Sequence, residues 1–212
     1  MKGGTGKSTL ATNLARGLQR HGPTCIVDAD PQGTALRWAS AAPEGADMPA
    51  VMSVSLPLNE RIPGVADGWD FTVVDGAAKA KDRTRQCVEV ADAVLIPIRP
   101  SGADIWASEW LVSVVKGRQE ATASEATASG KPAAAFVVSQ AIVGTNLAGE
   151  IEEVLERFEL PVFDGRTSQR VAYAEALSLG KTVLDTDPSG KAATEVQRIT
   201  YETLQLLTDT GT

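Results

Sequence analysis

Apolar runs rich in β-branched residues alternate along the chain with segments of helical periodicity. Most of these runs are continuous rather than alternating with polar positions, and continuous runs are typical of strands that are covered on both faces. We expect strands at Thr24–Asp28, Val51–Val54, Phe71–Asp75, Val94–Ile98, Ala134–Ser139 and, as a short edge strand, Val183–Leu184.

Helical segments separate the predicted strands. We predict helices over Lys7–Arg20, Thr34–Ala41, Asp82–Ala91, Asp104–Thr122, Leu147–Phe158, Ser168–Leu179 and Lys191–Leu207. Regular strand–helix alternation predicts an α/β fold with a mostly parallel sheet and helices on both faces. Ligands of such sheets bind beyond the carboxyl ends of the strands, so functional residues are expected there.

Size and composition are those of one globular domain covering residues 1–212. No stretch approaches the roughly 18 apolar residues of a membrane span, and no apolar signal region opens the chain, so we expect a cytoplasmic protein. Cys25 and Cys87 lack metal-type spacing and are expected to be reduced thiols. The net charge of −7 does not indicate nucleic-acid binding, although a local basic patch acts within about 10 Å regardless of the total.

The strongest chemical signal is the opening segment Lys2-Gly-Gly-Thr-Gly-Lys-Ser-Thr9. Its glycines let successive backbone N–H groups point at phosphate oxygens, and the following helix adds its positive N-terminus. In such a loop Lys7 reaches the β- and γ-phosphates, the Ser8 hydroxyl ligates Mg²⁺, and Thr9 donates to the α-phosphate. We therefore predict a phosphate-binding loop formed by Gly3, Gly4, Thr5, Gly6, Lys7, Ser8 and Thr9.

Two acidic motifs each follow a predicted strand. Asp28 and Asp30 stand two residues apart, and in a nucleotide site one such carboxylate holds a water on Mg²⁺ while the other orients an attacking water. Asp75 ends another strand, in the place of an acid that supports Mg²⁺ through water. Gly76 follows it and permits close approach to the γ-phosphate. Together with the loop, these residues predict a site for a magnesium-bound nucleotide.

These motifs together resemble the ParA-type partition ATPases, which share a deviant Walker A loop with MinD and the nitrogenase iron protein. The resemblance continues through residues 91–102, 166–177 and 180–184 and so spans essentially the whole chain. No helix-turn-helix precedes the loop, which places the chain with the short class. The resemblance implies a three-layer P-loop NTPase fold that uses ATP and Mg²⁺.

The resemblance also implies catalytic roles. Lys2 would be the signature lysine that reaches the partner's phosphates across an ATP-sandwich homodimer, where it stabilises transition-state charge together with Lys7. Asp30 would orient the hydrolytic water, and Asp28 would support Mg²⁺ through a water. Ser139 and Gln140 stand where the family often has a base-contacting Asn, so adenine selectivity is less defined than phosphate binding.

At the level of function, the resemblance implies an ATPase that is stimulated by a partner protein and binds DNA nonspecifically as an ATP-bound dimer associated with the nucleoid. It would segregate plasmid or chromosomal DNA with a centromere-binding partner. Alternatives are the positioning of carboxysomes or chemoreceptor clusters through a cargo adaptor and, with less support, an ATP-dependent metabolic ligase. The tail at 206–212 is no basic amphipathic helix, so no membrane partner is expected.

The DNA-binding candidates are basic residues in the C-terminal part, where family members carry such contacts. This part is acidic overall, since residues 150–212 hold six Lys and Arg against twelve Asp and Glu. Any basic strip would have to be assembled by folding. The candidates are Arg166, Arg170, Lys191 and Arg198.

Members of this family have an apolar central strand that leads into the loop. Met1 directly precedes Lys2 here, so we expect that strand to be lacking from these residues, through a misassigned start, a truncated gene or a trimmed sequence. Loss of a central strand would unpair its two neighbours and remove several buried side chains, each worth roughly 1.5–3 kcal/mol.

Overall fold

The computed structural model describes residues 4–77, 80–123, 130–144 and 147–209. Its strands are all parallel and form two sheets. Strands β1 (Thr24–Asp28), β2 (Ala50–Ser53) and β3 (Phe71–Asp75) pair in the order β2-β1-β3, while β4 (Ala93–Ile98) pairs with β5 (Ala133–Val138). Within the described residues β3 and β4 do not pair with each other, so each has one edge without a strand partner.

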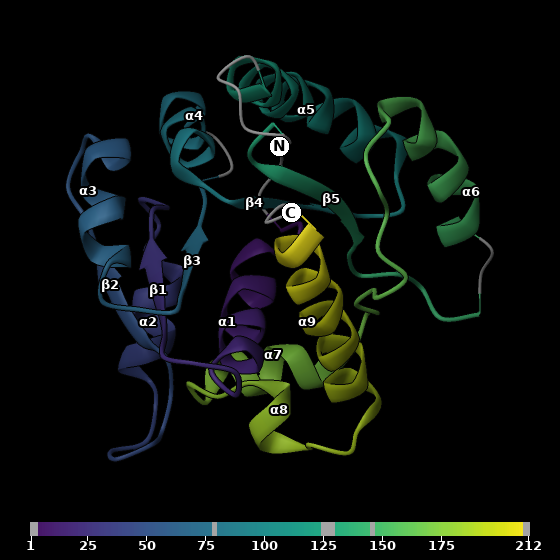
Figure 1. The fold of residues 1–212 in the computed structure, drawn as a ribbon. Helices are drawn as coiled ribbons and strands as arrows, with labels where there is room; N and C mark the ends of the chain where they lie inside the picture. Colours follow the sequence, from purple (N-terminus) through teal and green to yellow (C-terminus); the bar gives the residue numbers. More distant parts are fainter. Residues whose placement is uncertain (1–3, 78–79, 124–129, 145–146, 210–212) are drawn as a thin grey trace.

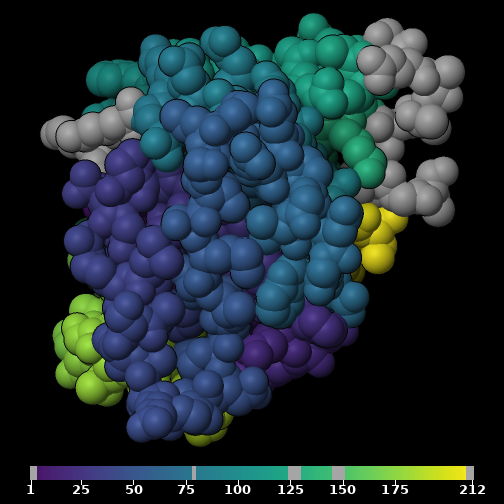
Figure 2. Space-filling view, turned by 90° about the vertical axis from the view of Figure 1, so that its left-hand side faces the viewer, coloured from purple at the N-terminus to yellow at the C-terminus, as the bar shows by residue number. Residues whose placement is uncertain are grey.

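Helices cover the strands on both sides (Figure 1). Helices α1, α2, α7, α8 and α9 lie on one side and span Lys7–Leu18, Thr34–Ser40, Val171–Ser178, Val183–Thr186 and Lys191–Asp209. The other side carries α3, α4, α5 and α6, which span Leu58–Ala66, Lys81–Val90, Gly102–Ala123 and Leu147–Leu155. Helices α3 and α4 form much of the surface seen in Figure 2. The predicted three-layer arrangement is therefore confirmed.

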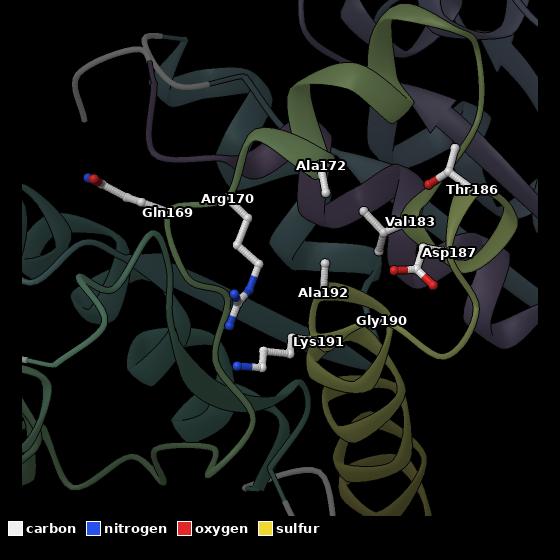
Figure 3. A pocket seen from close by; sticks show the side chains of 9 residues that line it. All are labelled: Gln169, Arg170, Ala172, Val183, Thr186, Asp187, Gly190, Lys191 and Ala192. Atoms are coloured by element: carbon white, nitrogen blue, oxygen red, sulfur yellow. The ribbon is translucent and has the colours of Figure 1, made fainter.

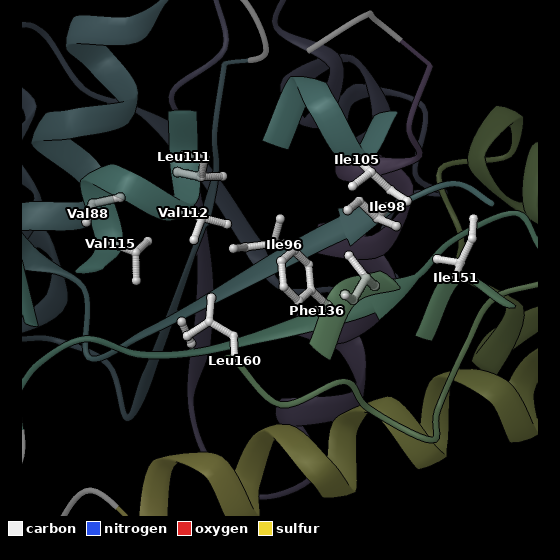
Figure 4. Packing of buried hydrophobic residues seen from close by; sticks show 12 residues of the cluster. Val88, Ile96, Ile98, Ile105, Leu111, Val112, Val115, Phe136, Ile151 and Leu160 are labelled. Carbon is white, nitrogen blue, oxygen red and sulfur yellow. The ribbon is translucent and has the colours of Figure 1, made fainter. Parts of the chain in front are cut away.

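The largest apolar cluster joins the second sheet to α5. Ile96 of β4 and Phe136 of β5 are fully buried, and they face Val112 and Val115 of α5 (Figure 4). Continuous burial along β1 and β5 explains why their sequences do not alternate. This packing fixes the carboxyl end of β5, which matters for the site below.

The structure corrects several predicted elements. Val183–Leu184 is not an edge strand but the start of α8, because Thr182 and Asp185 form a capping box that begins a helix. Helix α7 begins at Val171, and Ser168 instead forms an isolated bridge with Ala141. The last turn of the predicted helix at 147–158 is a 3₁₀ turn, η1 (Glu156–Phe158).

One helix was missed altogether. Helix α3 contains Pro63 and follows Pro57, and prolines at such positions usually indicate a loop. It forms because Leu58 and Ile62 bury against β1 and α4, which outweighs the weak local preference. The remaining predicted elements agree with the structure to within about two residues at each end.

Candidate functional site

The described part of the phosphate loop turns sharply into α1. Gly4 and Gly6 both have left-handed backbone angles, with φ of 100° and 79°. A Cβ at Gly6 would lie 2.9 Å from Ser139 Oγ, so this position needs glycine both for its conformation and for its close contact. Lys7, Ser8 and Thr9 form the first turn of α1 and are half-buried. Lys2 and Gly3 lie outside the described residues.

The two residues that follow β5 form hydrogen bonds with the backbone of the phosphate loop. The Ser139 hydroxyl donates to the Thr5 carbonyl at 2.9 Å, and Gln140 Nε2 donates to the Gly4 carbonyl at 2.8 Å. Gln140 itself has a left-handed backbone (φ 56°), and its N–H donates to Thr167 Oγ1. Ser139 and Gln140 thus contact the loop backbone, a role that sequence reasoning missed.

The acidic residues lie at adjacent strand ends. Asp28 and Asp75 are register partners at the carboxyl ends of β1 and β3. Asp28 is buried and organises the turn after β1, since its carboxylate accepts from the N–H groups of Asp30 at 3.2 Å and Leu36 at 3.0 Å. Asp30 is more accessible and accepts from the Gln32 N–H at 2.9 Å. The predicted clustering of the three carboxyl groups at one sheet edge is therefore present.

Asp75 is the most unusual group of the site. It is 1% exposed, and neither carboxylate oxygen accepts a hydrogen bond from another described residue. Burial, with Asp28 and Asp30 adding to it, raises the pKa of Asp75 to about 6, while the nearby Ser8 hydroxyl and Lys7 ammonium act in the opposite direction. A buried acceptor without a donor is costly, so its place beside the phosphate loop indicates a cationic ligand or bound water.

Lys7 completes the electrostatics of the site. Partial burial lowers the pKa of Lys7, and Asp75 and Asp30 oppose that effect. Among the described residues, its Nζ donates a single long bond of 3.4 Å, to Thr5 Oγ1. A Cβ added at Gly76 would meet no atom within 4 Å, so the space after Asp75 is open. The half-satisfied ammonium, the uncompensated carboxylate and the glycine loop together fit a magnesium-bound polyphosphate.

Helix α4 adds contacts that the sequence did not suggest. Arg83 Nη1 reaches the Ala29 carbonyl, between Asp28 and Asp30, at 3.4 Å. Thr84 Oγ1 donates to the Ala77 carbonyl at 3.1 Å. The first turn of α4 therefore contacts the turns that follow both acidic strands. The only visible signal was the run of charged and polar residues from Lys81 to Gln86, which forms the first turns of this helix.

The structure pairs most of the DNA-binding candidates with acids. Arg166 contacts Glu152 at 2.9 Å, Arg170 contacts Glu195 at 2.8 Å, and Arg198 contacts Asp164 as well as Glu202. Lys191 is exposed and makes no ion pair with the described residues.

Two of these candidates share a shallow pocket of about 350 Å³ between the starts of α7 and α9. The side chains of Arg170 and Lys191 extend toward the same space (Figure 3). The four candidates consequently form no continuous unpaired strip.

The model of one protein family matches most of the chain. The CobQ/CobB/MinD/ParA nucleotide-binding domain matches residues 1–184. The chain belongs to this family. The resemblance to ParA-type proteins is thereby confirmed.

Curated relatives match nearly the whole chain. The maintenance of carboxysome distribution protein A of Halothiobacillus neapolitanus is 29% identical over 208 residues, covering 96% of this chain and 93% of the relative. The chromosome-partitioning ATPase Soj of Thermus thermophilus is 26% identical and covers 96% and 92%.

Solved structures share the fold. Apo McdA of Cyanothece superposes with a TM-score of 0.72 at 16% identity, covering 96% of both chains. MinD of Aquifex aeolicus superposes with a TM-score of 0.74 at 15% identity, covering 96% and 93%. The predicted P-loop NTPase fold is confirmed. Among the described helices, none is both long and apolar enough to cross a membrane.

Proposed function

We propose that this chain is a Mg²⁺-dependent ATPase that positions a cellular cargo, as the carboxysome-distribution relative does. The observation that carries the proposal is the match to that relative over nearly the full length of both chains. The site supports an ATPase, since its loop, its lysine and its buried carboxylate suit a polyphosphate with a divalent cation.

We assign to the site residues the roles that the resemblance to ParA-type proteins implies. The loop from Gly3 to Thr9 binds phosphate oxygens, with Lys7 on the β- and γ-phosphates. Mg²⁺, when bound, neutralises phosphate charge and is held by Ser8 and, through water, by Asp28 and Asp75. No three described Asp, Glu, His or Cys side chains form a metal site by themselves. Asp30 orients the attacking water, and Lys2 acts on the phosphates of a second copy.

We further propose that ATP drives homodimer formation and that the dimer binds DNA without sequence preference. An adaptor protein on the cargo then stimulates ATP hydrolysis. Location at the nucleoid follows from that DNA contact. The paired arginines of the C-terminal part leave Lys191 as the candidate with an unengaged charge among the described residues. DNA retention should therefore be modest, and its salt dependence should be shallow, because few cations are free to neutralise phosphates.

Two measurements test this function. The purified protein should hydrolyse ATP with Mg²⁺, and Lys7→Ala should abolish this turnover. Equal turnover by the variant would show that the glycine loop is not the ATP-binding site. In the host, deletion of the gene should collapse evenly spaced cargo bodies into clusters, while DNA inheritance stays normal. Loss of plasmid or chromosome inheritance with evenly spaced bodies would instead favour DNA segregation.

DNA segregation is the second candidate, and the match to the chromosome-partitioning relative over most of both chains favours it. A ligase on the same scaffold remains distinguishable. ATP turnover that requires a small-molecule acceptor would support the ligase and count against both positioning functions.

A further inference from the structure

Helices α4 and α5 lie side by side (Figure 1), and basic residues of α4 and an aromatic residue of α5 are exposed to solvent. Lys81 and Arg85 are one turn apart on α4, and both are exposed. Trp106 and Trp110 are one turn apart on α5. The Lys81 Nζ lies 5.2 Å from the centroid of the Trp110 ring, so the two helices meet at these two side chains. We call these four residues the α4–α5 face.

Trp106 is the anomaly of this face. Its side chain is 69% exposed, whereas Trp110 packs partly against the core. Tryptophan and arginine are enriched in binding hot spots, and Trp106 lies one turn from Trp110, which Lys81 contacts. The face takes no part in the nucleotide site, so the ATPase chemistry does not explain it.

The α4–α5 face is basic, although the protein as a whole is acidic. The chain carries a net charge of −7, yet neither Lys81 nor Arg85 makes an ion pair with a described residue. Nearby acids are largely engaged, since Glu109 pairs with Arg157 and Glu89 accepts from Asn59. Asp82 alone adds an exposed negative charge on the first turn of α4.

We propose that the α4–α5 face docks a short acidic segment of a partner protein, with one large apolar or aromatic side chain seated on Trp106. The inference rests on the proposed function, in which an adaptor protein regulates the ATPase. Carboxylates complement Lys81 and Arg85, and a short segment covers only the basic face. Duplex DNA is a poorer fit, because its charges extend well beyond the face onto an acidic surface and it makes little use of an exposed indole.

Docking on the α4–α5 face would affect ATP hydrolysis through α4. The helix that carries Lys81 and Arg85 also holds the acidic turns, through Arg83 to the Ala29 carbonyl and Thr84 to the Ala77 carbonyl. A segment that shifts the first turn of α4 would change the position of Asp30 relative to the nucleotide. The expected effect is therefore on kcat at saturating ATP rather than on the KM for ATP.

The test is selection from a random 12-residue peptide display library on the wild-type protein with ATP and Mg²⁺. We expect the recovered peptides to be rich in Asp and Glu around one large apolar residue, and to bind at least tenfold more weakly to Trp106→Ala and to Arg85→Glu in fluorescence anisotropy. Tyr201→Ala is the matched control, because Tyr201 is 54% exposed and also lies near a cation, Arg198, but on α9. Its peptide affinity should equal that of the wild type.

Several outcomes would overturn the proposal: no recovered peptides, peptides without acidic residues, equal binding by Trp106→Ala, or a kcat that peptide leaves unchanged. Retention of a labelled duplex that depends on Trp106 and Arg85, without peptide binding, would reassign the face to DNA. Basal ATP turnover of Arg85→Glu should match the wild type. A wild-type protein without ATP turnover would instead count against the proposed function. The peptide affinities would still test the proposed docking on the α4–α5 face in that case.

Discussion

The Ser139 hydroxyl donates a 2.9 Å hydrogen bond to the Thr5 carbonyl and so joins the end of β5 to the phosphate loop across 134 positions of sequence. Gln140 does the same for the Gly4 carbonyl. Fixing these carbonyl oxygens away from the site keeps the loop N–H groups directed at an anion, because a peptide unit points its N–H opposite to its C=O. The loop is thus preorganised by residues that need not touch the nucleotide.

Removal of that hydroxyl should loosen the loop. Ser139→Ala leaves the buried Thr5 carbonyl without its donor, which costs roughly 1–3 kcal/mol. We expect ATP affinity, measured by isothermal titration calorimetry, to fall about tenfold with a smaller fall in thermal stability. Ser113→Ala is the control, because Ser113 is exposed and bonds only within α5. Equal affinities for both variants would show that the bond does not position the loop.

Gly6 tests the same contact from the other side. Gly6→Ala places a Cβ 2.9 Å from Ser139 Oγ at a φ of 79°, so the variant must distort the turn into α1. We expect nucleotide binding to be lost while the far-UV circular dichroism stays close to that of the wild type. Gly117→Ala is the matched control, since that helical glycine faces open space. It should stabilise the protein by about 0.5–1 kcal/mol.

The sequence signals of the candidate site are local. Glycine spacing predicts the loop, and an acid after an apolar run predicts a strand end, so Asp28 and Asp75 were placed correctly. Ser139 and Gln140 could not be assigned from sequence, because their contacts with the loop exist only once β5 is packed under α5.

Tertiary contacts also decided the elements that were predicted wrongly or missed. Helix α3 forms against its local preference because its apolar side chains are buried. The ion pairs that engage Arg166, Arg170 and Arg198 depend on side-chain approaches that composition alone does not reveal.

Binding and hydrolysis should separate at Asp30. Its carboxylate is accessible and makes a single described bond, to the Gln32 N–H, so Asp30→Ala should leave the fold and ATP binding intact. We expect single-turnover hydrolysis to slow by at least a hundredfold and the ATP-bound dimer to accumulate in size-exclusion chromatography. Asp67→Ala, an exposed acid after α3, should hydrolyse like the wild type. Brisk turnover by Asp30→Ala would remove the assigned role.

The stability of the nucleotide-free protein should depend on the charge of Asp75. Burial raises the pKa of Asp75 from 3.8 to about 6, so between these values the folded protein binds more protons than the unfolded chain. The free energy of unfolding therefore has a contribution from Asp75 that is lost as the pH rises through about 6. A difference of that size corresponds to about 3 kcal/mol.

Asp75→Asn cannot ionise and should lack this loss. In chelator without nucleotide, urea unfolding near pH 7 should show the variant to be more stable than the wild type by up to about 3 kcal/mol, and the advantage should shrink toward pH 4. Asp67→Asn corrects for the substitution itself, since Asp67 is exposed. A variant less stable than the wild type at both pH values would show that Asp75 is satisfied in the empty protein. The expected gain in stability should come with weaker Mg²⁺-dependent ATP binding, because the uncompensated charge that destabilises the empty site is the one a magnesium-bound nucleotide would neutralise.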